Sequence, residues 1–481
     1  MANSNTSFTP DQMRDTQGLL FSGYADMSHC SYYLLEIKDA KKAKAWLKIV
    51  ANRITAGEPD KDKRKTTDAL NLAFGKPGLD KLGVDTSYFE QAFQDGMHSL
   101  SRATILGDEG DNQANKWLWG NDAKPVHLLL MLYAEDEATF GKRQQEEESA
   151  FKSGGLNLIQ RLDTINMEND GRFEKEHFGF ADGVSQPMVE SFSNKSPSAD
   201  PQTPQVIPTG EFVLGYPNGY DGKITAVPGD PAKPDNQRYG FNGTYLVFRH
   251  MQQDVPGFWK FVRAEAKKQV IDPDYLAAKI VGRWKNGALV EPGKESAPLI
   301  DPANPPDMNT FDFRNDLDGK GCPYGSHIRR TNPRGQGLGV EVYVAPGTVS
   351  EENIRNSLKV ANRHRIIRRG RSYGNFLKNP VKDDPAGERG LFFICLNANI
   401  ERQFEFIQHT WVNNLKFNGL YDEDDPLIGT YKSTWPGFKR SFTLQEDPLR
   451  RKVCGFPEFV KIKGGSYFFL PGIKALKMLA D

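Results

Sequence analysis

The beginning of the chain pairs a short apolar run with an amphipathic segment. Residues 31–37 are rich in aromatic and aliphatic side chains and predict a β-strand. The next segment, residues 40–51, has apolar side chains at i, i+3, i+4 and i+7 with lysines between them, namely Ala43, Trp46, Leu47 and Val50. This spacing predicts a helix with one buried face. A strand followed by an amphipathic helix is therefore the expected opening.

The same alternation continues along the chain. Further strands are predicted at residues 67–74, 126–133, 243–249, 339–344 and 390–396. Further helices are predicted at residues 78–83, 136–152 and 400–413, and in a segment that contains Phe258, Trp259 and Phe261. Two polar stretches with many prolines, residues 191–235 and 286–319, are predicted as long loop insertions, the first with an ordered piece at residues 210–216.

This pattern indicates two α+β halves, residues 1–170 and 171–481. It is also compatible with an α/β fold, because short strands between helices occur in both classes. A length of 481 residues suits two or three domains, although one elaborated domain fits as well.

Charge and targeting signals narrow the possible partners. Lys plus Arg and Asp plus Glu number 62 each, so no net charge favours nucleic acid or an anionic membrane. No apolar run approaches the roughly 20 residues of a membrane helix, and residues 1–10 lack a signal-peptide profile. Four scattered cysteines without a C-x-x-C pair predict reduced thiols. We therefore expect a cytoplasmic protein.

The most distinctive chemistry lies in residues 322–334. One imidazole, His327, has three arginines within seven residues, Arg329, Arg330 and Arg334. Imidazole is a common metal ligand, and guanidinium groups suit an anionic ligand periphery, so iron in a carboxylate-bearing macrocycle fits both. A solvated basic loop around a structural histidine is the alternative.

Three motifs together resemble one family. G-F-A-D-G at residues 179–183, followed by S-Q-P at 185–187, matches the G-x-x-D-G signature of the dye-decolourising peroxidases. H-I-R-R-T-N-P-R at residues 327–334 and I-I-R-R-G-R-S-Y-G at 366–374 are similar to the family's haem-ligand and distal arginine segments. The chain looks more like the larger intracellular-type members. The resemblance implies two ferredoxin-like domains with antiparallel sheets and covering helices, of the dimeric α+β barrel type, with haem in the C-terminal half.

The resemblance also implies which residues hold the haem. His327 is the expected axial ligand of the iron, and Glu401 is the expected acidic partner of its second ring nitrogen. The other expected haem contacts are Gly183, Val184, Ser185, Asn332 and Arg334. Arg329 and Arg330 are expected either to join them or to form structural salt bridges.

On the opposite side of the haem, peroxide requires a proton acceptor and a fixed positive charge. Asp182 is the family-matched general acid/base, although an Asp-Gly pair is by itself typical of a turn. Arg368 is the expected distal arginine and haem contact, with Arg369 as the alternative. A basic surface helix end is the expectation for the remaining arginines, Arg363, Arg365 and Arg371.

These residues imply a haem-dependent peroxidase that reduces hydrogen peroxide and oxidises phenolic or dye-like donors in one-electron steps. One non-covalent haem b per chain is expected, because the thioether motif C-x-x-C-H is absent. Tyr373 and Trp411 are candidates for electron relay to bulky donors, with core packing as the alternative. A haem carrier or iron-release protein, and a haem-free interaction protein, are the alternative functions. The oligomeric state stays open.

Overall fold

The computed structural model describes residues 8–59, 66–165, 173–190, 206–301, 308–309, 311–336, 350–382, 386–430, 437 and 439–481. Its strands are β1 (His29–Ile37), β2 (Asp68–Phe74), β3 (Leu128–Ala134), β4 (Leu156–Asp163), β5 (Thr244–Gln253), β6 (Ile367–Arg368), β7 (Arg371–Tyr373), β8 (Gly390–Asn397), β9 (Ser441–Leu444), β10 (Arg451–Cys454) and β11 (Val460–Leu470).

Its α-helices are α1 (Pro10–Arg14), α2 (Ala40–Val50), α3 (Lys76–Lys81), α4 (Gln91–Asp95), α5 (Leu100–Leu106), α6 (Glu137–Ser153), α7 (Val255–Gln269), α8 (Pro273–Val281), α9 (His327–Thr331), α10 (Glu351–Asn362) and α11 (Ile473–Leu479). Two π-helices, η10 (Glu401–Glu405) and η11 (Ile407–Val412), and a short 3₁₀ turn, η4 (Gly110–Asn112), also bear on the site.

The described strands of the large sheet pair antiparallel throughout, in the order β4-β1-β3-β2-β11-β5-β8-β6, with β7 also on β8. Each half repeats the order fourth-first-third-second, which is the ferredoxin-like arrangement. The two halves join where Phe469 of β11 pairs with Phe74 of β2. The expected α+β class is therefore confirmed, and the parallel α/β alternative is wrong.

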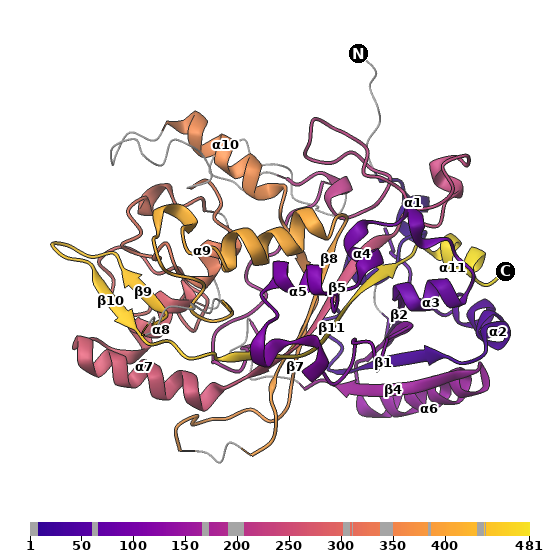
Figure 1. Cartoon of the computed structure of the whole chain (residues 1–481), viewed down its shortest axis with the longest axis horizontal. Helices are drawn as coiled ribbons and strands as arrows, with labels where there is room; N and C mark the ends of the chain where they lie inside the picture. Colours follow the sequence, from indigo (N-terminus) through magenta and orange to yellow (C-terminus); the bar gives the residue numbers. More distant parts are fainter. Residues whose placement is uncertain are drawn as a thin grey trace.

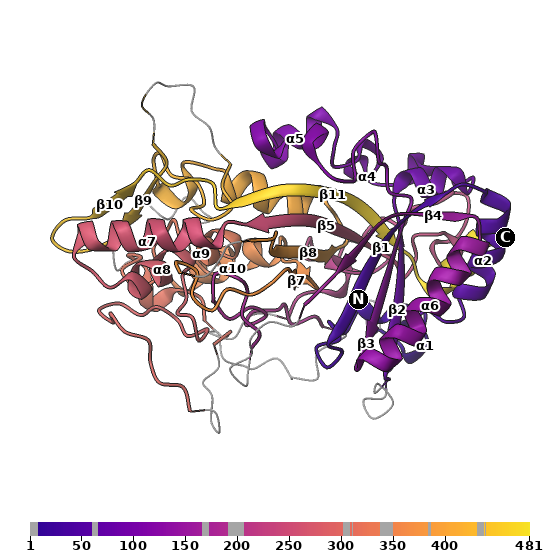
Figure 2. The same ribbon diagram turned by 90° about the horizontal axis from the view of Figure 1, so that it is seen from below.

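The two halves of the sheet also pack against each other through side chains. Strands β1 to β3 run steeply across the direction of β5, β8 and β11 (Figure 2). Between them the Tyr32 ring contacts Phe248 and Phe392 edge-on, at 5.4 and 5.9 Å between ring centroids. Helices α2 and α6 lie beside the N-terminal strands, and α7 to α9 lie at the far end of the C-terminal half (Figure 1). The halves thus share one apolar core.

Local sequence signals account for the N-terminal elements. Helix α2 begins after Asp39, whose carboxylate accepts a hydrogen bond from the Lys42 backbone N–H at 3.0 Å. Its four predicted apolar residues are all buried. The predicted strands correspond to β1, β2, β3, β5 and β8, and the segment at 400–413 is helical. The ordered piece at 210–216 contains only a short turn, Thr209–Glu211.

Other predictions are missed or lie outside the described residues. Strand β4 was not predicted, because as an edge strand it exposes several residues and its apolar alternation is weak. Strand β11 was not predicted because the glycine pair at Gly464 and Gly465 interrupts its pattern, and a register shift occurs there. The predicted strand at 339–344 and the boundary at residue 170 lie outside the described residues, so both stay predictions.

A buried ion pair connects the two halves beside the C-terminal sheet. Asp108, between α5 and η4, accepts two hydrogen bonds from the Arg249 guanidinium of β5, at 2.9 and 2.5 Å. Burial raises the pKa of the Asp108 carboxyl, and Arg249 opposes this rise. The pair therefore positions the segment α5–η4 on the outer face of β5. None of the described helices is long and apolar enough to cross a membrane.

We expect Asp108→Ala to lower the free energy of unfolding by about 3–5 kcal/mol, because the substitution leaves a buried guanidinium without its counter-charge. Denaturant unfolding measures the change. Asp111→Ala is the matched control, since the Asp111–Lys116 pair is solvent-exposed and its loss should cost less than about 1 kcal/mol. Equal losses for both variants would contradict a structural role of the buried pair.

Candidate active site

A cavity of about 300 Å³ lies against the C-terminal half of the sheet. Its floor consists of side chains from one face of three neighbouring strands, because every second residue of a strand points to the same side. These floor residues are Arg249, Met251 and Gln253 of β5, Leu391 and Phe393 of β8, and Val460 and Ile462 of β11. The opposite face of the same strands carries the core between the halves.

The roof of the cavity comes from short helical segments. Helix α9 and the π-helices η10 and η11 contribute His327, Ile328, Thr331, Phe404, Ile407, Gln408 and Val412. π-Helical turns are rare and are frequently found at functional sites. Except for His327, Thr331 and Gln408, these roof residues are apolar, and most of the charged residues that line the cavity come from other segments.

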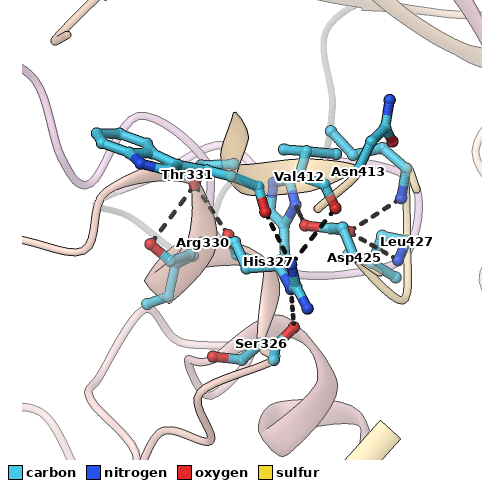
Figure 3. Close-up of polar contacts among 12 residues, drawn as sticks. Ser326, His327, Arg330, Thr331, Val412, Asn413, Asp425 and Leu427 are labelled. Atoms are coloured by element: carbon cyan, nitrogen blue, oxygen red, sulfur yellow. Dashed lines mark hydrogen bonds and ion pairs between the residues drawn. The ribbon is translucent and has the colours of Figure 1, made fainter. Parts of the chain in front are cut away.

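Helix α9 in the roof presents His327 to the cavity, and Figure 3 shows the contact of this imidazole with Asp425. Its Nδ1 lies 2.9 Å from Oδ2 of Asp425, whose side chain is fully buried. The other oxygen of Asp425 accepts hydrogen bonds from the backbone N–H groups of Leu427 and Ile428, at 2.9 and 3.0 Å. Burial raises the pKa of the Asp425 carboxyl, but the imidazole and these N–H groups outweigh it and hold that pKa below its usual range. An ionised Asp425 fixes the proton of His327 on Nδ1, which leaves the Nε2 lone pair for a ligand.

Asp425 takes the role that the sequence analysis gave to Glu401, and we correct that assignment. Glu401 lies at the start of η10 with 44% of its side chain exposed, and its carboxylate pairs with Arg102 at 2.9 Å. Its helix directs it towards the N-terminal half and away from the cavity. The sequence did not single out Asp425, because it stands 98 residues from His327 in a run of acidic residues.

Arg330 and Arg329 hold helix α9 in place. The Arg330 guanidinium, fully buried, donates to the backbone carbonyls of Trp411, Asn414 and Glu423 at 2.7, 3.0 and 2.6 Å (Figure 3). Arg329 donates to the Cys322 carbonyl and pairs with Asp316 at 3.1 Å. Their hydrogen bonds to surrounding loops favour the structural one of the two expected roles.

Asp182 and Arg368 line the same cavity as His327. Arg368 of β6 donates from Nη1 to the Asp182 carboxylate at 2.9 Å and from Nη2 to the Ser185 carbonyl at 3.2 Å. Both side chains are about a third exposed, at 37% and 36%, so each remains accessible from the cavity. The structure therefore brings together the two groups that the sequence analysis assigned to the distal side.

A hairpin turn positions Asp182. The Asp182 N–H donates to the Glu174 carbonyl, and the Glu176 N–H to the Phe180 carbonyl, both at 2.9 Å. The Glu176 carboxylate also lines the cavity and accepts from the N–H groups of Phe178 and Phe180 and from Gln253. Burial raises the pKa of Glu176 to about 7. The sequence analysis missed this residue, because its turn-closing hydrogen bonds have no sequence signature.

The expected haem contacts line the same cavity. Gly183 has φ of +75°, and a Cβ built on it would meet no atom within 4 Å, so its backbone borders open space. Val184, Ser185 and Asn332 also line the cavity. The guanidinium of Arg334 binds a neighbouring loop, because it donates hydrogen bonds to the carbonyls of Asn309 and Phe311 at 2.7 and 2.9 Å.

Of the remaining arginines, two bind the N-terminal half and one lines the cavity. Arg369 donates to the carbonyls of Leu19 and Leu20, and Arg371 to that of Met27. Arg365 lines the cavity and is only 8% exposed. The expectation of a basic surface helix end is therefore wrong for Arg365, which is buried, and for Arg371, which lies in strand β7, whereas Arg363 does lie at the end of helix α10.

Both candidate relay residues are buried. Tyr373 stacks on Phe392 with 4.4 Å between ring centroids, and Trp411 contacts Phe406 and His364 edge-on. Both belong to apolar core clusters, as the core-packing alternative proposed.

The donors around the cavity fit a haem. No described residues form a group of three His, Cys, Asp or Glu that could hold a bare metal ion. A single imidazole beside an apolar slot instead supplies one axial ligand and leaves the equatorial positions to a macrocycle. No described residue forms a hydrogen bond with Nε2 of His327, and the open space at Gly183 lets a flat ring approach the backbone.

Comparisons with known proteins place this fold and cavity in a class. Residues 16–164 match the family model described as the DyP dimeric alpha+beta barrel domain. The dye-decolorizing peroxidase msp1 of Mycetinis scorodonius is 31% identical over 437 residues, which cover 85% of this chain and 76% of that protein.

Solved structures agree over nearly the whole chain. The DyP-type peroxidase of the fungus Auricularia auricula-judae superposes with a TM-score of 0.77 at 25% identity and covers 98% of this chain and 99% of its own. A dye-decolorizing peroxidase in complex with 2,6-dimethoxyphenol gives a TM-score of 0.76 at 26% identity, with the same coverage of both chains. The protein is thus a haem peroxidase. The chain belongs to the dye-decolourising peroxidase family.

The neighbouring arginines at 368 and 369 should respond differently to substitution. Arg368→Leu removes a partly exposed ion pair, so we expect a loss of less than about 1 kcal/mol in the free energy of unfolding. Arg369→Leu leaves the buried carbonyls of Leu19 and Leu20 without donors and should cost about 2–4 kcal/mol. Denaturant unfolding measures both. A larger loss for Arg368→Leu would show that Arg368 is the structural residue of the two.

Proposed function

We propose that this peroxidase binds one non-covalent haem b per chain in the cavity between His327 and the pair Asp182–Arg368. The observation that carries the proposal is that these groups, far apart in sequence, line one cavity, with His327 on helix α9, Arg368 on strand β6 and Asp182 on a hairpin turn. The apolar floor and roof suit the faces of the ring. When bound, the haem supplies the redox chemistry, because its iron takes up the oxidising equivalents of peroxide and passes them to a donor.

His327 would hold the haem iron through Nε2, the ring nitrogen that makes no hydrogen bond with a described residue. Its Nδ1–H donates to the buried Asp425 carboxylate, which makes the imidazole a stronger electron donor and fixes the orientation of its ring. The two backbone N–H groups on the other Asp425 oxygen keep this carboxylate from turning away.

Asp182 moves the proton that peroxide cleavage requires. Its carboxylate accepts the proton from one peroxide oxygen and returns it to the other, which leaves as water. Arg368, 2.9 Å from Asp182, stabilises negative charge on the departing oxygen during this transfer.

Phenols and dye-like aromatic compounds are the proposed donors. This class rests on the names of the relatives and on the solved complex of one of them with 2,6-dimethoxyphenol. The alternative of a haem carrier or iron-release protein is less well supported, because the cavity contains an acid/base and a paired arginine that transport does not require.

The axial ligand is tested by His327→Ala. We expect this variant to lose stable haem binding, because the cavity then offers no imidazole to the iron. Titration of the apoprotein with haem, followed by the Soret band, measures binding. His409→Ala is the control, since His409 is an exposed histidine of another roof helix, η11. Unchanged haem affinity in His327→Ala would contradict the ligand assignment.

The acid/base is tested by Asp182→Asn. This variant should keep its haem and react with peroxide about 10²–10⁴ times more slowly, because an amide cannot accept the proton. Stopped-flow absorption after mixing with stoichiometric peroxide gives the rate. Glu174→Gln, an exposed position of the same hairpin, should leave the rate within about twofold of the unsubstituted enzyme. A spectrum inert to peroxide in the unsubstituted protein would favour the carrier function.

A further inference from the structure

The arginines of the cavity differ in whether the protein neutralises them. Five line it, namely Arg249, Arg283, Arg334, Arg365 and Arg368. Arg249 pairs with Asp108, and Arg368 with Asp182. Arg283 donates to the carbonyls of Gly287 and Met308 at 2.8 and 2.9 Å. Arg334 donates to carbonyls of the loop around Asn309, so four of the five have partners within the chain.

Arg365 differs from these four. Its backbone accepts a hydrogen bond from Gln403 at 2.7 Å and donates one to Asn362, but its guanidinium contacts no hydrogen-bonding or acidic group of the described residues. The side chain lines the cavity while the residue is 92% buried, as its 8% exposure implies. Burial, together with the positive charge of Arg368, lowers the pKa of Arg365 to about 10. No carboxylate opposes this shift.

A buried guanidinium without an anion is costly for the folded protein, because burial removes its hydration and nothing replaces it. Such a group is retained where a ligand supplies the opposite charge. The remaining lining near Arg365 is apolar or amide, with Ile366, Phe404, Ile407 and Gln408. The cavity thus combines apolar side chains with one guanidinium, that of Arg365, which has neither an acidic nor a hydrogen-bonding partner among the described residues.

We propose that Arg365 binds a carboxylate of the haem periphery and is the main counter-charge for the macrocycle in this chain. The inference rests on the proposed haem site and assigns a residue outside the three motifs that define it. Planar guanidinium matches a carboxylate with two parallel hydrogen bonds, which also fixes the rotation of the ring in its slot. Arg334, which the sequence analysis expected to contact the haem, instead donates N–H groups to loop carbonyls and supports the cavity wall.

The test compares haem with its dimethyl ester, in which both carboxylates are neutralised. Apoproteins of the unsubstituted chain, Arg365→Met and Arg363→Met are titrated with each ligand, and the Soret band gives the Kd. Arg363 is the matched control, because it lies two residues away but donates to the Gly219 carbonyl and stacks on Tyr220 outside the cavity.

We expect Arg365→Met to weaken haem binding roughly 10- to 100-fold and ester binding less than about threefold, since only haem offers the carboxylate. Arg365→Lys should recover part of the haem affinity, and Arg363→Met should change neither Kd. Equal losses for haem and ester in Arg365→Met, or no loss, would overturn the assignment while leaving the haem site intact. An unsubstituted protein that binds neither ligand would overturn the proposed function itself.

A second readout separates recognition from a structural role. Thermal unfolding of apo Arg365→Met should occur at or above the temperature of the unsubstituted apoprotein, because the substitution removes an unneutralised buried charge. Haem should then raise the melting temperature of the variant less than that of the unsubstituted protein. A lower melting temperature for the apo variant would count against the proposal, because it would mean that Arg365 stabilises the protein without the ligand.

Discussion

The structure depends on one constraint, which is that the C-terminal strands are covered on both faces. In β5 and β8, alternate residues such as Phe248 and Phe392 fill the core between the two halves, while Arg249 and Phe393 point into the cavity. Because a strand exposes successive side chains to opposite sides, a one-residue shift in register would exchange the two sets. The core between the two halves therefore determines which side chains form the floor of the cavity. It thereby also sets the positions of the catalytic groups around that floor.

The roof has the opposite character, because its short helices have little stability of their own. Helix α9 has only five residues, far fewer than an isolated helix requires in water. Its position comes from long-range polar contacts, in which Arg330 donates to carbonyls at the end of η11 and just after it, and Asp425 holds His327. The ligand residue thus sits on an element that tertiary hydrogen bonds hold in place, and this explains why buried arginines are concentrated next to it.

The sequence predicted what local periodicity and local motifs encode. The spacing of Ala43 and Trp46 was enough to identify α2, and the motifs around Asp182 and His327 identified two groups that line one cavity. Asp425 could not be recognised, because nothing in a run of acidic residues marks the one that meets an imidazole 98 positions away. The π-helical form of η10 and η11 could not be predicted either, since the same apolar spacing also suits an α-helix.

The arginines at 363–371 show why composition alone cannot assign roles within one basic segment. Arg369 and Arg371 both donate hydrogen bonds to backbone carbonyls of the N-terminal half. Arg368, the residue before Arg369, instead lines the cavity and contacts Asp182. On the N-terminal side every bond ends on a backbone carbonyl, an arrangement that joins two parts of a fold and leaves nothing for a ligand. On the cavity side, the partner of Arg368 is a titratable carboxylate, and Arg365 has no partner within the described chain. Function therefore follows from which face of the sheet each guanidinium reaches, because only on the cavity face is positive charge left for the ligand and its reaction.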